Sequence, residues 1–91
     1  MNGALDRRQM FKLEIVLEDI AAERERQVAK GWTPEHDDAH GASHLIRHAW
    51  DRAASARNAL MTDREAARAE IVKSAALLVA AAEALDRLED A

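Results

Sequence analysis

The sequence contains no cysteine, which excludes disulfide bonds and thiolate metal ligands and is typical of proteins in the reducing cytoplasm. Tyrosine is also absent, and the chain has only one proline, one phenylalanine and three glycines. Because Ala, Leu, Glu and Arg dominate instead, the composition predicts an all-α protein. Residues 1–91 suffice for one small domain. We expect a bundle of three main helices plus a short helical turn, completed by oligomerisation.

Long apolar runs and an excess of basic charge are lacking too. No segment approaches the roughly 18 uninterrupted apolar residues of a membrane-spanning helix, and charged residues interrupt the first part of the chain where a signal peptide would be apolar. The formal net charge is −4, without a basic run. We therefore expect no membrane association and no broad nucleic-acid binding, and we place the protein in the cytoplasm.

Apolar spacing predicts a first helix from about Leu5 to Ala29, which ends at Gly31 because glycine accepts a left-handed cap conformation. The connection that follows is long for a helical bundle. In it, Thr33 and Pro34 have the pattern of an N-cap and first helical residue, so one short turn is expected from Pro34 to Asp38. The buried stripe expected for the first helix is Met10, Leu13, Leu17 and Ile20.

Two further helices are expected. The second begins with Ser43 as N-cap and reaches about Met61, and the third follows a capping box of Thr62 and Glu65 and reaches about Asp90. Periodicity assigns to their buried faces Leu45, Ile46, Ala49, Trp50, Ala53 and Leu60, and then Ile71, Ala75, Leu78, Ala82 and Leu85.

The segment from Lys30 to His48 concentrates the side chains that bind metals. It holds all four histidines and the carboxylates Glu35, Asp37 and Asp38. If the segment folds back on the first helix, Glu23 joins these carboxylates, and Mg²⁺ binds through such oxygen ligands together with substrate phosphates. The alternative is that the acids only complement the start of a helix.

The histidines allow a second kind of metal site. His44 and His48 lie four residues apart on an expected helix, so both imidazoles face one side, as in helical zinc sites. Zn²⁺ is therefore the alternative metal to Mg²⁺, although this face also enters the core. Further ligands would come from the preceding segment, through His36, His40, Asp37 or Asp38. Trp32, in the same segment, either stacks on a nucleobase or plugs the bundle.

Several strings resemble a group of small phage and prophage proteins that we associate with the MazG-like all-α nucleoside triphosphate pyrophosphohydrolases. The similarity extends from about Ile20 to Arg87, and its most specific part is Gly-Trp-Thr-Pro-Glu-His-Asp-Asp. The matching positions are Glu23, Arg24 and Gln27, then Gly31 to His40, and in the last helix Glu70 to Leu78 and Glu83 to Arg87.

The resemblance implies a homo-oligomer, dimeric or tetrameric, that binds nucleoside triphosphates with Mg²⁺ and releases pyrophosphate, in the host cytoplasm if a phage encodes the chain. It implies Glu35 and Asp38 as catalytic residues. The metal ligands that it implies are Glu23, Glu35 and Asp38, and Asp37 and His40 are added to them from the cluster of carboxylates and histidines in the same segment. The implied nucleotide contacts are Lys30, Arg47 and Lys73 for the phosphates and Trp32 for the base.

The chain departs from the family pattern in its second acidic pair. MazG-like enzymes pair two acids on each of two helices, whereas here the helix after the loop has no acid before Asp51. This leaves a second hypothesis, a catalytically inactive helical interaction protein, for example a phage inhibitor of a host defence complex with a host protein as partner.

Overall fold

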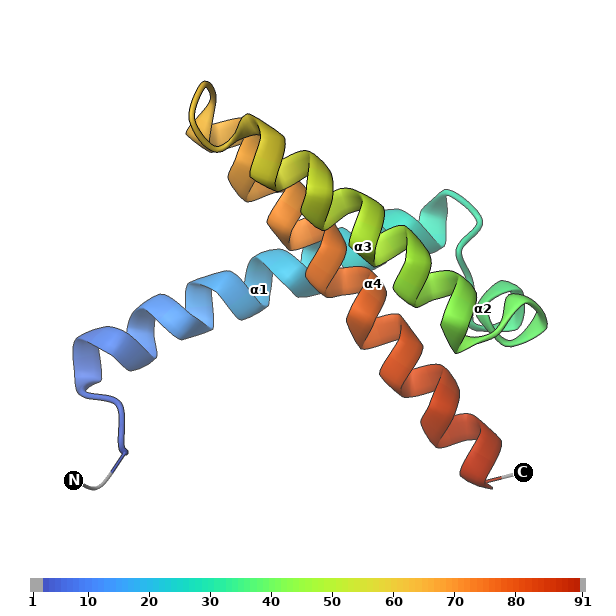
Figure 1. Ribbon diagram of the computed structural model, residues 1–91. Helices are drawn as coiled ribbons and strands as arrows, with labels where there is room; N and C mark the ends of the chain where they lie inside the picture. Colours follow the sequence, from blue (N-terminus) through green and yellow to red (C-terminus); the bar gives the residue numbers. More distant parts are fainter. Residues whose placement is uncertain (1–2, 91) are drawn as a thin grey trace.

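The computed structural model describes residues 3–90, and in this part of the chain all regular structure is helical. The predicted all-α fold is thereby confirmed. Helices α3 and α4 run side by side as a hairpin, α1 crosses α4, and the N-terminal half of α1 extends away from the other helices (Figure 1). None of the described helices is both long and apolar enough to cross a bilayer. The helices are α1 (Arg7–Ala29), α2 (Pro34–His40), α3 (Ala42–Ala59) and α4 (Arg64–Asp90).

Helix α1 begins two residues later than the predicted Leu5. The Asp6 carboxylate accepts a hydrogen bond from the Gln9 amide at 2.8 Å, and the Gln9 side chain accepts one from the Asp6 amide at 3.0 Å. This reciprocal capping box satisfies two backbone donors that a helix start otherwise leaves unpaired, and so it fixes the boundary.

Helix α4 starts on a different cap from the predicted one. The Asp63 carboxylate accepts a hydrogen bond from the Ala66 amide at 3.0 Å, so Asp63 acts as the N-cap. The Thr62 hydroxyl instead donates to the Ala59 carbonyl at 3.4 Å, at the end of the preceding helix. The predicted capping box of Thr62 and Glu65 is therefore wrong, by one residue, because the aspartate competes for the same backbone donors.

Helix α2 starts as predicted and is longer than expected. The Thr33 side chain accepts a hydrogen bond from the His36 amide at 3.2 Å, and the helix continues to His40. Gly41 then reverses the chain with φ 87° and ψ 160°, and α3 follows at once without a side-chain cap. The predicted Ser43 N-cap is wrong because Gly41 already occupies the cap position.

Gly41→Ala is expected to lower the free energy of unfolding by about 2 kcal/mol, because its φ and ψ lie in a region that only glycine adopts without strain. Urea denaturation followed by circular dichroism measures this. The control is Ser43→Ala, two residues further on an exposed position, which should change stability by less than about 0.5 kcal/mol. Equal losses in the two variants would contradict the assignment of strain.

The core is built mainly from small side chains. Leu45 is completely buried, and seven of the ten buried apolar residues are alanines, so the helices approach closely while each contact removes little apolar area from water. Trp32 packs against this core from the loop after α1, in agreement with the plug interpretation. The central cluster consists of Leu45, Ala49, Leu77, Ala80, Ala81 and Ala84.

The larger apolar side chains lie outside the core. Trp50, predicted to be buried, is 74% exposed, and the predicted stripe of α1 is mostly exposed as well. In α4 the predicted face is wrong: the helix turns its alanines toward α3, and its bulkier side points away from the rest of the chain. We call this outward side the apolar face of α4; it consists of Ile71, Ala75, Leu78, Ala82 and Leu85.

Candidate functional site

At the end of α1 the chain reverses direction, and the following loop packs against the core. Gly31 adopts φ 108°, as the sequence predicted for a helix stop, and the Trp32 amide donates to the Gln27 carbonyl at 2.9 Å. The reversal brings the indole to the side of the molecule where α3 begins. Half-buried Trp32 therefore has one side on the core and another available to neighbouring side chains.

Arg24 fastens α2 to α1. Its guanidinium donates to the fully buried Asp37 carboxylate at 2.7 Å and to the Trp32 carbonyl at 3.1 Å. A buried charge is tolerated when it is paired and hydrogen-bonded, and here one arginine serves both purposes. The oxygen of Asp37 that faces away from Arg24 lies 3.2 Å from Nδ1 of His36. Asp37 is thus a structural anchor that also orients an imidazole.

The other acids expected to bind Mg²⁺ point to different partners. Asp38 binds Arg87 of α4 at 2.8 Å, Glu23 binds Arg26 at 2.8 Å, and Glu35 is exposed on α2. Within the described residues, the one converging group of three or more metal-capable side chains contains only histidines. Because Mg²⁺ requires oxygen ligands, the residues that one chain brings together do not fit the expected magnesium site.

A cavity of about 240 Å³ lies where α1, α3 and α4 meet. Four residues implied by the family resemblance as nucleotide contacts or metal ligands line it: Glu23, Lys30 and Trp32 on the side of α1, and Lys73 of α4 on the opposite side. Its remaining lining residues are Gln27, His48, Arg52 and Leu77. We call it the cation-lined cavity, since three cationic side chains reach it on a chain with formal charge −4.

Two further polar lining residues were not predicted as nucleotide contacts: His48, which was expected only as a metal ligand, and Arg52. They lie four apart on α3, so they share a helix face, and this spacing was the available signal. Arg47, by contrast, faces a separate groove beside Trp50 and Asp51. The structure therefore brings Lys30, Trp32 and Lys73 together and leaves the fourth predicted nucleotide contact elsewhere.

The four histidines form a continuous row along α2 and the start of α3. Ring centroids are 4.1 Å apart for His36 and His40, 4.7 Å for His40 and His44, and 4.5 Å for His44 and His48. Trp32 lies against the row, with its ring 4.9 Å from His36 and 5.0 Å from His48. Desolvation lowers the pKa of His44, and the neighbouring imidazoles lower it further, which favours its neutral form.

The chain matches no protein-family model, and no match was found among curated proteins or solved structures.

Proposed function

We propose that this protein binds the phosphates of a nucleoside triphosphate in the cation-lined cavity, as a divergent relative of the MazG-like proteins. The observation that carries the proposal is the meeting of Lys30 and Trp32, at the end of α1, with Lys73 of α4 in one hollow. Ammonium groups anchor phosphate oxygens as point charges, and an indole offers a face for a base.

The charges around the cavity favour an anion. Neither Lys30 nor Lys73 is in an ion pair with the described residues, whereas Glu23 is already paired with Arg26. Arg52 shares its charge with Glu70 at 3.3 Å. Two ammonium groups without a local counter-ion are therefore free to bind phosphate oxygens.

The size of the cavity limits what it encloses. Its volume of about 240 Å³ is below the range of about 300–1,000 Å³ that is common for small-molecule sites, so we propose that it takes the phosphates while the nucleoside lies outside against Trp32. The carboxylates expected to bind Mg²⁺ do not converge on one site within a single chain, so the proposal is limited to nucleotide binding. Hydrolysis through Glu35 and Asp38 stays a prediction.

Lys73→Ala is expected to weaken triphosphate binding about tenfold, because it removes one charge-assisted contact, and Lys30→Ala should do the same. Calorimetry with a panel of dNTPs and with inorganic triphosphate, in the presence of Mg²⁺, measures the affinity, and released pyrophosphate reports turnover. Arg47→Ala is the matched control and should leave the affinity unchanged. No heat and no rise in melting temperature with any triphosphate would overturn the proposal, as would an equal loss in the Arg47 variant.

We also propose that the protein is a homo-oligomer in which a second copy covers the apolar face of α4. The bulky residues Ile71, Leu78 and Leu85 recur every seven positions and are about half exposed. Alanines between them allow another helix to approach closely. Because this spacing suits packing of α4 on an identical helix, a second copy is the favoured occupant over a host protein.

A groove between α1 and α4 continues the apolar surface. It has a volume of about 510 Å³ and is lined mainly by apolar side chains, among them Leu17, Ile20, Val28 and Val79. Together with the alanine-rich core, the groove supports the view that one chain buries too little apolar area alone.

A further inference from the structure

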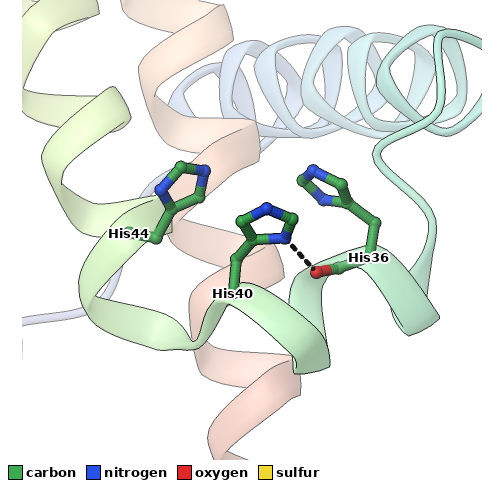
Figure 2. A group of neighbouring side chains, drawn as sticks. All are labelled: His36, His40 and His44. Carbon is green, nitrogen blue, oxygen red and sulfur yellow. Dashed lines mark hydrogen bonds between the residues drawn. The ribbon is translucent and has the colours of Figure 1, made fainter.

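Three imidazoles converge where α2 meets α3. The candidate ligand nitrogens of His36, His40 and His44 all lie within 4.8 Å of one another, with His40 between the other two rings (Figure 2). We propose that these three histidines bind one divalent transition-metal ion of the zinc class. The proposal goes beyond nucleotide binding and does not depend on it, because none of the three lines the cation-lined cavity.

The hydrogen bonds of two rings fix which nitrogen is free to bind a metal. Nδ1 of His40 lies 2.8 Å from the His36 carbonyl oxygen, which can only accept, so Nδ1 carries the proton and Nε2 the lone pair (Figure 2). Nδ1 of His36 lies 3.2 Å from the Asp37 carboxylate and donates in the same way. Both rings thus present an unprotonated Nε2, the form in which histidine binds metals.

The surroundings of the rings are also those of a metal site. Asp37, itself held by Arg24 at 2.7 Å, fixes the orientation of His36, and a carboxylate behind a histidine ligand is the usual arrangement at zinc. Trp32 closes the inner side of the site, at 4.9 Å from His36 and 5.9 Å from His44. His40 is exposed, which leaves an entry path on the outer side.

Binding requires a small closure of the rings. Zinc–nitrogen bonds of about 2.0–2.1 Å place tetrahedral ligand atoms about 3.3 Å apart, so the widest separation of 4.8 Å must shrink by about 1.5 Å. Because His40 lies between the other two rings, the outer rings of His36 and His44 must move toward each other. Both side chains are only partly buried, so small rotations supply movement of this size without disturbing the core. Three protein ligands leave a fourth position open, and imidazole ligands favour Zn²⁺, Cu²⁺ or Ni²⁺ over Mg²⁺.

The metal would join two helices that the chain connects through Gly41 alone. His36 and His40 belong to α2, whereas His44 belongs to α3. A bound ion therefore holds α2 against the start of α3. Because it binds the folded arrangement, saturating metal is expected to raise the melting temperature.

The test uses untagged, full-length protein stripped with a chelator and then titrated with Zn²⁺ or Co²⁺. We expect one ion per chain by elemental analysis, together with visible Co²⁺ bands of the four-coordinate type. His40→Ala should weaken binding at least about 100-fold and abolish the thermal shift. His44→Ala should do the same. His48→Ala is the matched control, from the same row but outside the converging group, and it should bind metal like the wild type.

Two results would overturn the proposal. One is a stripped protein that takes up no Zn²⁺ or Co²⁺ and shows no thermal shift. The other is metal binding that survives His40→Ala and is lost in His48→Ala, which would assign the site to the pair His44 and His48. Circular dichroism of each variant verifies that the helices are intact. Inorganic triphosphate, added in a separate titration, reports on the cation-lined cavity, so failure of one proposal is distinguishable from failure of the other.

Discussion

Asp37→Asn is expected to lower the free energy of unfolding by about 3 kcal/mol, since removal of one partner from a buried ion pair leaves the other charge uncompensated. The Asp37 side chain is 0% exposed and that of Arg24 only 14%. The expected loss lies at the lower end of the usual range because Glu83 lies 3.7 Å from the same guanidinium and partly compensates its charge. For a domain of this size the loss is a large share of total stability. Urea denaturation at one fixed protein concentration measures it.

The matched control is Asp38→Asn, the same substitution at the next residue. Asp38 pairs with Arg87, and both side chains are more than a third exposed, so solvent screens the pair and a loss of at most about 1 kcal/mol is expected. Hydrogen exchange at the α2 amides distinguishes local opening of α2 from unfolding of the whole domain. Faster exchange confined to α2, with an unchanged denaturation midpoint, would contradict a contribution of Asp37 to global stability.

The parts of the fold that the sequence predicts well depend on neighbouring residues. The helix stop at Gly31 and the Thr33 cap of α2 are local signals, and both are found where expected. Caps fail where two candidates compete within one or two residues, as Asp63 does with Thr62. Such competition is decided by backbone geometry, which composition and spacing do not determine.

The buried faces were harder to predict for a different reason. Periodicity shows that α4 has a side rich in Ile and Leu, and one chain nevertheless buries the alanine side. A periodic pattern identifies an apolar face without identifying the helix that covers it. The predicted burial of Trp50 is wrong for the same reason: the side of α3 on which it lies is apolar, but no described element covers it.

In the candidate sites too, features that depend on neighbouring residues could be predicted, and contacts between distant residues could not. Histidines at every fourth position from His36 to His48 could be placed in one row from spacing alone, apart from the turn at Gly41. The pairing of Arg24 with Asp37 links residues on either side of a chain reversal, and no sequence signal announces it. Because Asp37 is paired with Arg24, it is not available as a ligand for Mg²⁺, and its other oxygen lies against Nδ1 of His36.

The two proposed sites meet at one shared side chain. Trp32 lines the cation-lined cavity and also lies against the proposed metal ligands, with its ring centroid 4.9 Å from that of His36 and 5.9 Å from that of His44. A ligand in either site therefore contacts Trp32 or a side chain that packs against it. We expect occupation of either site to reduce the mobility of Trp32, which its fluorescence can report.

If the protein is the homo-oligomer proposed above, Leu78→Glu is expected to convert it into monomers, weakening self-association more than about 100-fold. In a symmetric interface the substitution occurs twice. Because Leu78 is already about half buried in the single chain, each lost leucine removes about 0.8–1.5 kcal/mol of apolar burial, and the desolvation and mutual repulsion of the two new charges weaken association further. Leu78 lies at the centre of the apolar face of α4, between Ile71 and Leu85, and is 48% exposed in the single chain. Sedimentation velocity over a range of concentrations measures the change.

Ser43→Glu is the control for Leu78→Glu. It introduces the same charge at an exposed residue of α3, beside the groove that Arg47 and Trp50 line and not on the apolar face of α4, and it should leave self-association unchanged. A wild-type protein that sediments as a monomer at all concentrations would contradict self-association and favour a different protein as the occupant of this face. Dissociation by both variants would show that added charge alone is responsible. If only Leu78→Glu dissociates, then the side of α4 predicted to be buried is buried, in the assembly and not in the single chain.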